Sequence, residues 1–79
     1  MTTPHITPEI AAHVLHHFRR GGRPGSTSVR ELLAEFDTAN ARHRLQLAKE
    51  FPGYDAAYEL ATHTDNGIAL LQARANDDH

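Results

Sequence analysis

Residues 28–51 read SVRELLAEFDTANARHRLQLAKEF and form the longest run of helix-compatible residues in the chain. A segment rich in glycine and proline precedes this run, and the sequence FPGY closes it. At 3.6 residues per turn, a helix over this stretch collects one stripe of mostly apolar side chains. The pattern therefore predicts a long central helix, over about 28–51, against which the rest of the chain packs. The members of the stripe are Val29, Leu32, Leu33, Phe36, Asn40, His43, Leu47 and Phe51.

Two members of this stripe, Asn40 and His43, are polar, and the long helix has an alternative with a kink near 37–40. Asp37 is a residue type that caps a second helical segment, and Leu45 points away from the stripe of a straight helix. A buried amide needs a hydrogen-bond partner. Asn40 therefore bonds a neighbouring loop, marks a helix break, or fixes the register of an oligomer seam.

Shorter helices flank the central stretch. Thr7 and Pro8 are typical of a helix start, and Gly21 and Gly22 stop that helix after residue 20. Ser28 with Glu31 has capping-box spacing and begins the central helix. Further helices are expected over about 54–64 and 68–75. We thus expect an all-α fold of three or four helices in a single domain, 1–79, with frayed ends at about 1–6 and 76–79.

The composition sets bounds on the class of protein. Seventy-nine residues with no cysteine form one small domain without disulfides or thiolate metal sites. A core of this size is marginal, so self-association into a homo-oligomer is one way to stabilise it. The N-terminus does not resemble a signal peptide, and no apolar run is long enough to span a membrane. These features favour a cytoplasmic protein without membrane contact.

Charge is unevenly distributed, although the net charge is only −2. Residues 10–30 contain no acid, so one end of the molecule is expected to be basic. Such an end can contact nucleic-acid phosphates. The acids Glu31, Glu35 and Asp37 follow immediately and would repel a phosphate backbone. The candidate macromolecule-binding residues of this basic end are Arg19, Arg20, Arg23 and Arg30.

Two other patterns suggest chemistry only in outline. His13 and His17 are four residues apart on one helix, a spacing that can chelate a metal, but no HExxH pattern is present and a third ligand is missing. The loop GGRPGSTS precedes a helix as a phosphate cradle does, without P-loop spacing. No nucleophile motif or compelling carboxylate pair is evident. We therefore expect no enzyme, no cofactor and no metal.

The stretch 21–61 contains GGRPG at 21–25, then a leucine-rich segment with Asn40 near its centre, and FPGY at 51–54. With these motifs it resembles a group of small proteins from actinobacteriophages and actinobacterial prophages. The sequences of that group loosely follow one pattern, which is GGxPG, then a leucine-rich helix with a central Asn, and then FPxY. The resemblance implies a phage or prophage origin, in the cytoplasm of a bacterial host, and no particular activity. The matching positions are Gly21, Gly22, Pro24, Gly25, Leu32, Leu33, Asn40, Leu47, Ala48, Phe51, Pro52, Tyr54 and Ala57.

Taken together, the sequence favours a small accessory or regulatory protein that acts by binding another macromolecule. The leading expectation is a protein-interaction module whose partner is a host or phage protein, or a second copy of the chain. The alternative is a nucleic-acid-associated regulator that uses the basic end.

Overall fold

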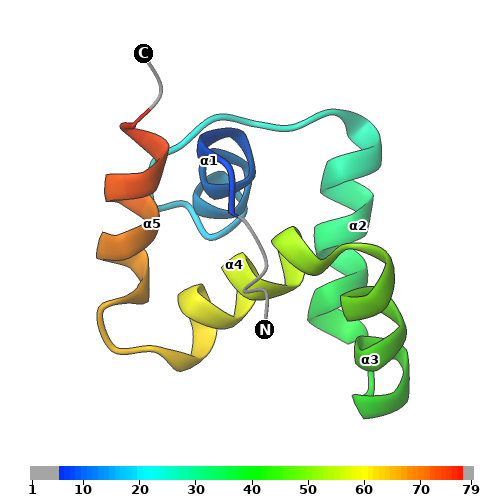
Figure 1. Cartoon of the computed structure of the whole chain (residues 1–79). Coiled ribbons are helices and arrows are strands. Elements are labelled where there is room, and N and C mark those ends of the chain that lie inside the picture. Colours follow the sequence, from blue (N-terminus) through cyan, green and yellow to red (C-terminus); the bar gives the residue numbers. More distant parts are fainter. Residues whose placement is uncertain (1–5, 78–79) are drawn as a thin grey trace.

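The computed structural model describes residues 6–77, and these residues form five α-helices and no strand. The predicted all-α class is confirmed, with five helices in place of three or four. Figure 1 shows α1 seen nearly end-on, with α5 on one side and with α2 and α3 on the other. The helices are α1 (Pro8–His17), α2 (Thr27–Thr38), α3 (Ala41–Glu50), α4 (Pro52–His63) and α5 (Gly67–Ala75).

Helix α1 begins as predicted and ends earlier than predicted. The Thr7 hydroxyl accepts a hydrogen bond from the Ile10 amide at 3.1 Å, and Pro8 occupies the first turn. The expected end at residue 20 is wrong, because the helix stops at His17. Arg19 already has a φ of 59°, in the left-handed region. The turn thus starts before the glycines that were expected to make it.

The long helix expected over 28–51 is two helices. Helix α2 ends at Thr38, Ala39 is extended, and α3 begins at Ala41. The Asn40 side chain caps α3 by accepting a 2.8 Å hydrogen bond from the His43 amide. The break thus falls inside the interval 37–40 that the sequence had offered, and Asn40, not Asp37, is the cap.

Other helix boundaries differ from the predictions by a few residues. Ser26, rather than Ser28, caps α2, since its hydroxyl accepts from the Val29 amide at 3.3 Å. Pro52 was expected only to end the preceding helix, but it also opens α4. Helix α5 starts at Gly67, one residue before its expected start.

Helices α1 and α4 each pack against several other helices. Helix α1 packs on α2, α4 and α5, and α4 packs on α1, α3 and α5. The predicted packing of the chain around residues 28–51 is therefore not confirmed. All five helices supply the core, and Tyr58 is the one side chain with a polar group that is buried among the described residues. The core residues are Ala11, Val14, Leu15, Leu32, Leu33, Phe36, Leu47, Ala57, Tyr58 and Leu71.

The chain ends only partly fit the expected fraying. Ile6 packs against the core, and its carbonyl accepts a 2.6 Å hydrogen bond from Arg74 Nε. The expectation that residue 6 frays is therefore wrong. Asn76 and Asp77 form a turn after α5. The rest of the predicted frayed ends, residues 1–5 and 78–79, lies outside the described residues.

Candidate anion-binding site

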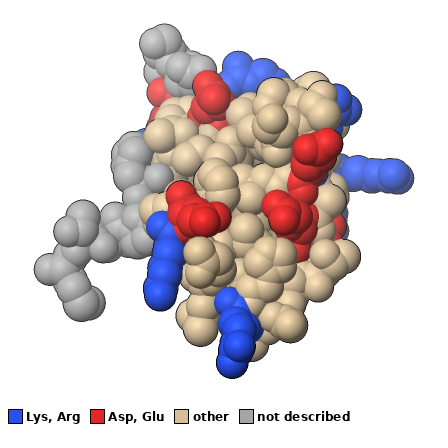
Figure 2. All heavy atoms as spheres, turned by 90° about the vertical axis from the view of Figure 1, so that its right-hand side faces the viewer, with Lys and Arg blue, Asp and Glu red and all other residues tan. Residues whose placement is uncertain are grey.

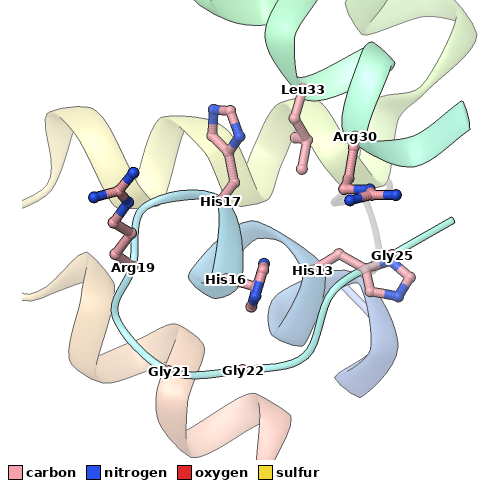
Figure 3. A pocket seen from close by; sticks show the side chains of 9 residues that line it. All are labelled: His13, His16, His17, Arg19, Gly21, Gly22, Gly25, Arg30 and Leu33. Carbon is pink, nitrogen blue, oxygen red and sulfur yellow. The ribbon is translucent and has the colours of Figure 1, made fainter. Parts of the chain in front are cut away.

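The main candidate site is an open hollow of about 600 Å³, which we call the basic hollow. The second half of α1, the loop that follows and the first turns of α2 surround it (Figure 3). In this view the loop curves around His16, from Arg19 on one side to Gly25 on the other. The hollow is lined by His13, His16, His17, Arg19, Gly21, Gly22, Gly25, Arg30 and Leu33.

The loop is held tightly against α1 by its backbone. Gly22 has a φ of +73°, and a Cβ atom there would lie 2.1 Å from the carbonyl oxygen of Ala12. The same carbonyl accepts a hydrogen bond from the Arg23 amide at 3.1 Å. Because the backbone passes so close to α1, the loop holds Arg19 and Arg30 at the same hollow.

His13 is fixed by Tyr54 of α4. Its Nδ1 lies 2.8 Å from the Tyr54 hydroxyl, and the two rings are stacked with centroids 6.2 Å apart. Burial, with a smaller contribution from the negative charge of Glu9, raises the pKa of Tyr54. The phenol therefore stays protonated, and within residues 6–77 Nε2 of His13 has no hydrogen-bond partner.

His17 is fixed by an acid at the end of α2. Its Nε2 lies 2.9 Å from Asp37 Oδ2, while the Tyr58 hydroxyl donates to Asp37 Oδ1 at 2.5 Å. Burial and then the hydrogen bond to Asp37 raise the pKa of Tyr58 to about 12. Asp37 thus ties α1 and α4 to the last turn of α2, and it does not cap a helix.

Three further side chains of the basic hollow have no acidic partner in the part of the chain that the structure describes. Arg19, Arg30 and His16 are exposed, and none of them forms an ion pair with any residue between 6 and 77. An arginine without an acidic neighbour presents its planar set of donors to an anion from solution. The basic hollow therefore suits a small, multiply charged anion such as phosphate.

The four arginines of the predicted basic end are divided between two hollows. Arg20 and Arg23 line a second hollow of about 460 Å³, between the loop and α5. Gly21 and Gly22 line both hollows. The structure thus brings Arg19 and Arg30 together with the three histidines and turns Arg20 and Arg23 toward the end of α5.

Asn40 and His43, the polar members of the predicted stripe, lie away from both hollows. Both are exposed, and Asn40 serves as the cap of α3. His43 Nε2 is 3.9 Å from Glu35 Oε1, a long contact at the surface. Asn40 therefore has the structural role that one of the sequence alternatives gave it, that of marking a helix break.

Arg44 shows what a neutralised arginine looks like in this fold. Its Nε lies 3.1 Å from Asp55 Oδ1, and its Nη2 lies 3.0 Å from Glu59 Oε1. The guanidinium also covers the rings of Phe36 and Tyr58, at 5.1 and 4.7 Å from the ring centroids. Arg44 thus joins α3 to α2 and α4, which is a structural task.

The surface over α2 and α3 has mixed charge. Figure 2 shows acidic and basic side chains interspersed there, with uncharged surface between them. Mixed signs give a weaker net field than a cluster of one sign. This face is therefore a poorer candidate for an anionic partner than the basic hollow.

The interpretation of His13 and His17 as a metal site requires a third ligand, and none lies near them among the described residues. Within residues 6–77, no group of three or more histidine, cysteine, aspartate or glutamate side chains is placed to hold a metal ion. Each histidine instead has a partner from another helix, Tyr54 or Asp37.

None of the helices in residues 6–77 combines the length and the apolar character that a membrane span requires.

No protein-family model, curated protein or solved structure matches the chain. The functional interpretation therefore depends on the residues themselves.

Three residues that shape the site were not expected from the sequence to do so. Tyr54 is 41 residues from His13, and Asp37 and Tyr58 come from other helices than His17. Their spacing in the sequence carries no signal of contact. The acid-free stretch 10–30 and the glycine-rich loop GGRPGSTS were the patterns that pointed to the basic hollow.

Proposed function

We propose that this chain is a small accessory or regulatory protein that acts by binding nucleic acid, with the basic hollow as its contact surface. One observation carries the proposal: Arg19, Arg30 and His16 line the same hollow and have no acidic partner among the described residues. Arginine forks and exposed loop amides are the groups that hold phosphates in nucleic-acid complexes. A phage or prophage origin fits such a role, and no catalytic activity is proposed.

A protein partner, the leading expectation from the sequence, has less support in the geometry. Among residues 6–77, the large apolar side chains that remain exposed are Leu45 on α3, Phe51 between α3 and α4, and Leu70 on α5. Leu45 is the most exposed of them, at 67%. Apolar residues exposed on separate elements are ordinary and do not mark an interface. Binding to a protein, or to a second copy, stays the alternative to be distinguished by experiment.

The proposal is tested by fluorescence anisotropy with labelled single- and double-stranded DNA and RNA at low salt. Binding should fall steeply as salt rises. Each charge-assisted hydrogen bond contributes about 1.5–3 kcal/mol, so the double variant R19Q/R30Q should bind at least about tenfold more weakly.

The matched control is R42Q. Arg42 is exposed on α3, away from the basic hollow, and its replacement removes the same kind of charge. R42Q should bind nearly as well as the unaltered chain. Failure of all four nucleic acids to bind at low salt would sink the proposal, and so would an equal loss in R42Q and in the single variant R30Q.

A further inference from the structure

We infer that the basic hollow takes a phosphomonoester, the terminal phosphate of a nucleic-acid strand or of a free nucleotide, in preference to a phosphate inside a strand. This inference rests on the proposed function and names the ligand of the same site.

The shape of the basic hollow favours an end group. A phosphate inside a strand is joined to the chain on both sides, so it needs an open groove along which the strand can continue. The basic hollow is open to solvent, but the loop from Arg19 to Gly25 curves around His16, and α1 and α2 border the hollow as well (Figure 3). Its volume of about 600 Å³ lies in the range of small-molecule sites. A terminal phosphate enters such a space without a chain leaving on the far side.

The charges of the lining side chains also favour an end group. A phosphomonoester carries a charge of about −1.5 to −2 near neutral pH and offers three terminal oxygens. A phosphodiester carries a single negative charge. Arg19 and Arg30 stand on either side of His16 in the view of Figure 3. Two guanidinium groups that have no acidic partner within residues 6–77 gain more from the doubly charged ligand.

The histidines supply directed donors. His16 makes no side-chain bond within residues 6–77, while His13 and His17 are each held through one ring nitrogen only. An imidazole has two distinct nitrogens, and an N–H of either donates to a phosphate oxygen. His13 and His17 are therefore oriented by Tyr54 and Asp37, and His16 is the side chain most accessible to the ligand.

The floor and the loop leave room for a phosphate. Leu33 lines the hollow and is buried almost completely, so the floor is apolar and firmly packed. Gly21 has open space where a Cβ atom would be. A ligand there meets backbone without an intervening side chain.

The experiment compares single-stranded oligonucleotides of one sequence that differ only at the ends, with a 5′-phosphate, a 3′-phosphate or hydroxyl groups. We expect one of the phosphorylated strands to bind about tenfold more tightly than the hydroxyl-ended strand, as for one added charge-assisted contact. Inorganic phosphate should remove this difference. A mononucleotide that binds as tightly as the phosphorylated strand would identify the free nucleotide as the source of the phosphomonoester.

Variants separate the site from the rest of the surface. H16Q should lose most of the preference for the phosphorylated end, and R30Q should lose it as well. H43Q is the control, because His43 is exposed on α3. Thermal unfolding of each variant shows whether its fold is intact.

Two results would overturn the inference. If all strands bind equally well, the preference for an end group is wrong, although nucleic-acid binding itself is upheld. A phosphorylated peptide that binds more tightly than any oligonucleotide would assign the hollow to a protein ligand and contradict both proposals.

Discussion

At the scale of single residues, Gly22 is the position where the loop has least freedom. It combines a φ of +73° with a close approach to the Ala12 carbonyl, whereas Gly21 has a φ of +100° and open space around it. An L residue in the left-handed region costs about 1–2 kcal/mol. Both glycines therefore resist substitution, but only Gly22 is also blocked by backbone of α1.

This contrast gives a paired prediction. Gly21→Ala should lower the free energy of unfolding by about 1–2 kcal/mol, the cost of positive φ. Gly22→Ala should lower it further, because the Ala12 carbonyl must move from its hydrogen bond with the Arg23 amide. Urea denaturation of the two variants measures the difference. A loss for Gly22→Ala no larger than that for Gly21→Ala would show that the loop does not pass as close to α1 as described.

Tyr58 links stability to pH. Its phenol is buried and donates to Asp37, so its pKa rises from 10.0 to about 12. Between these values the folded chain holds a proton that the unfolded chain releases. The stability that this proton provides is complete below pH 10.0 and is lost as the pH rises through about 12.

The free energy of unfolding should therefore fall from pH 10.0 to about 12, and Tyr58→Phe should reduce that dependence. Urea denaturation at several pH values checks the slope, and tyrosinate absorbance reports the titration itself. Tyr54→Phe serves as a comparison, since the pKa of Tyr54 is also raised but through burial beside His13. An unchanged slope in Tyr58→Phe would contradict the role given to its bond with Asp37.

At the scale of elements, the break between α2 and α3 shows where sequence patterns stop being decisive. The apolar stripe continues across Ala39 and Asn40 because each helix keeps its own inward face, with Phe36 before the break and Leu47 after it. No glycine or proline marks the break. Periodicity alone therefore suggested one helix. The sequence offered a break near 37–40 but gave the capping role to Asp37, whereas Asn40 caps α3.

The start of α2 is a second helix boundary that local sequence patterns do not decide. Ser26 and Ser28 are both candidate caps, because the hydroxyl of each can accept a hydrogen bond from the backbone amide three residues later. Ser28 also has Glu31 at the spacing of a capping box. The structure uses Ser26. Local rules rank such neighbours poorly, because the path of the loop over α1 decides where the helix can begin. The start of α1 at Thr7 and Pro8 was predictable, since both residues favour the same position.

The cap of α3 is a testable element. Asn40→Ala should lower the free energy of unfolding by about 1 kcal/mol, because the His43 amide loses its acceptor. Asn40→Ser should retain most of the stability, since serine caps about as well. Hydrogen exchange at the first turn of α3 should accelerate in the alanine variant only. Equal losses in both variants would contradict the capping role.

At the scale of the whole molecule, the segment that carries the positive charge could be predicted, but the division of that charge between two hollows could not. The acid-free stretch 10–30 pointed to one basic end. The fold then divides it, with Arg19 and Arg30 at the basic hollow and Arg20 and Arg23 near α5. The bonds of His13 and His17 to other helices also depend on tertiary packing. A sequence pattern finds residues that are close along the chain, and these contacts join residues far apart in it.

The central claim is that the basic hollow is the binding surface of this protein. Titration of an isotope-labelled chain with a short oligonucleotide, followed by two-dimensional NMR, tests it most directly. The amides of His16, Arg19, Gly21, Gly22 and Arg30 should shift most, and those of α3 should shift little. Shifts centred on α3 or on the outer face of α5, or no shifts at low salt, would contradict the account.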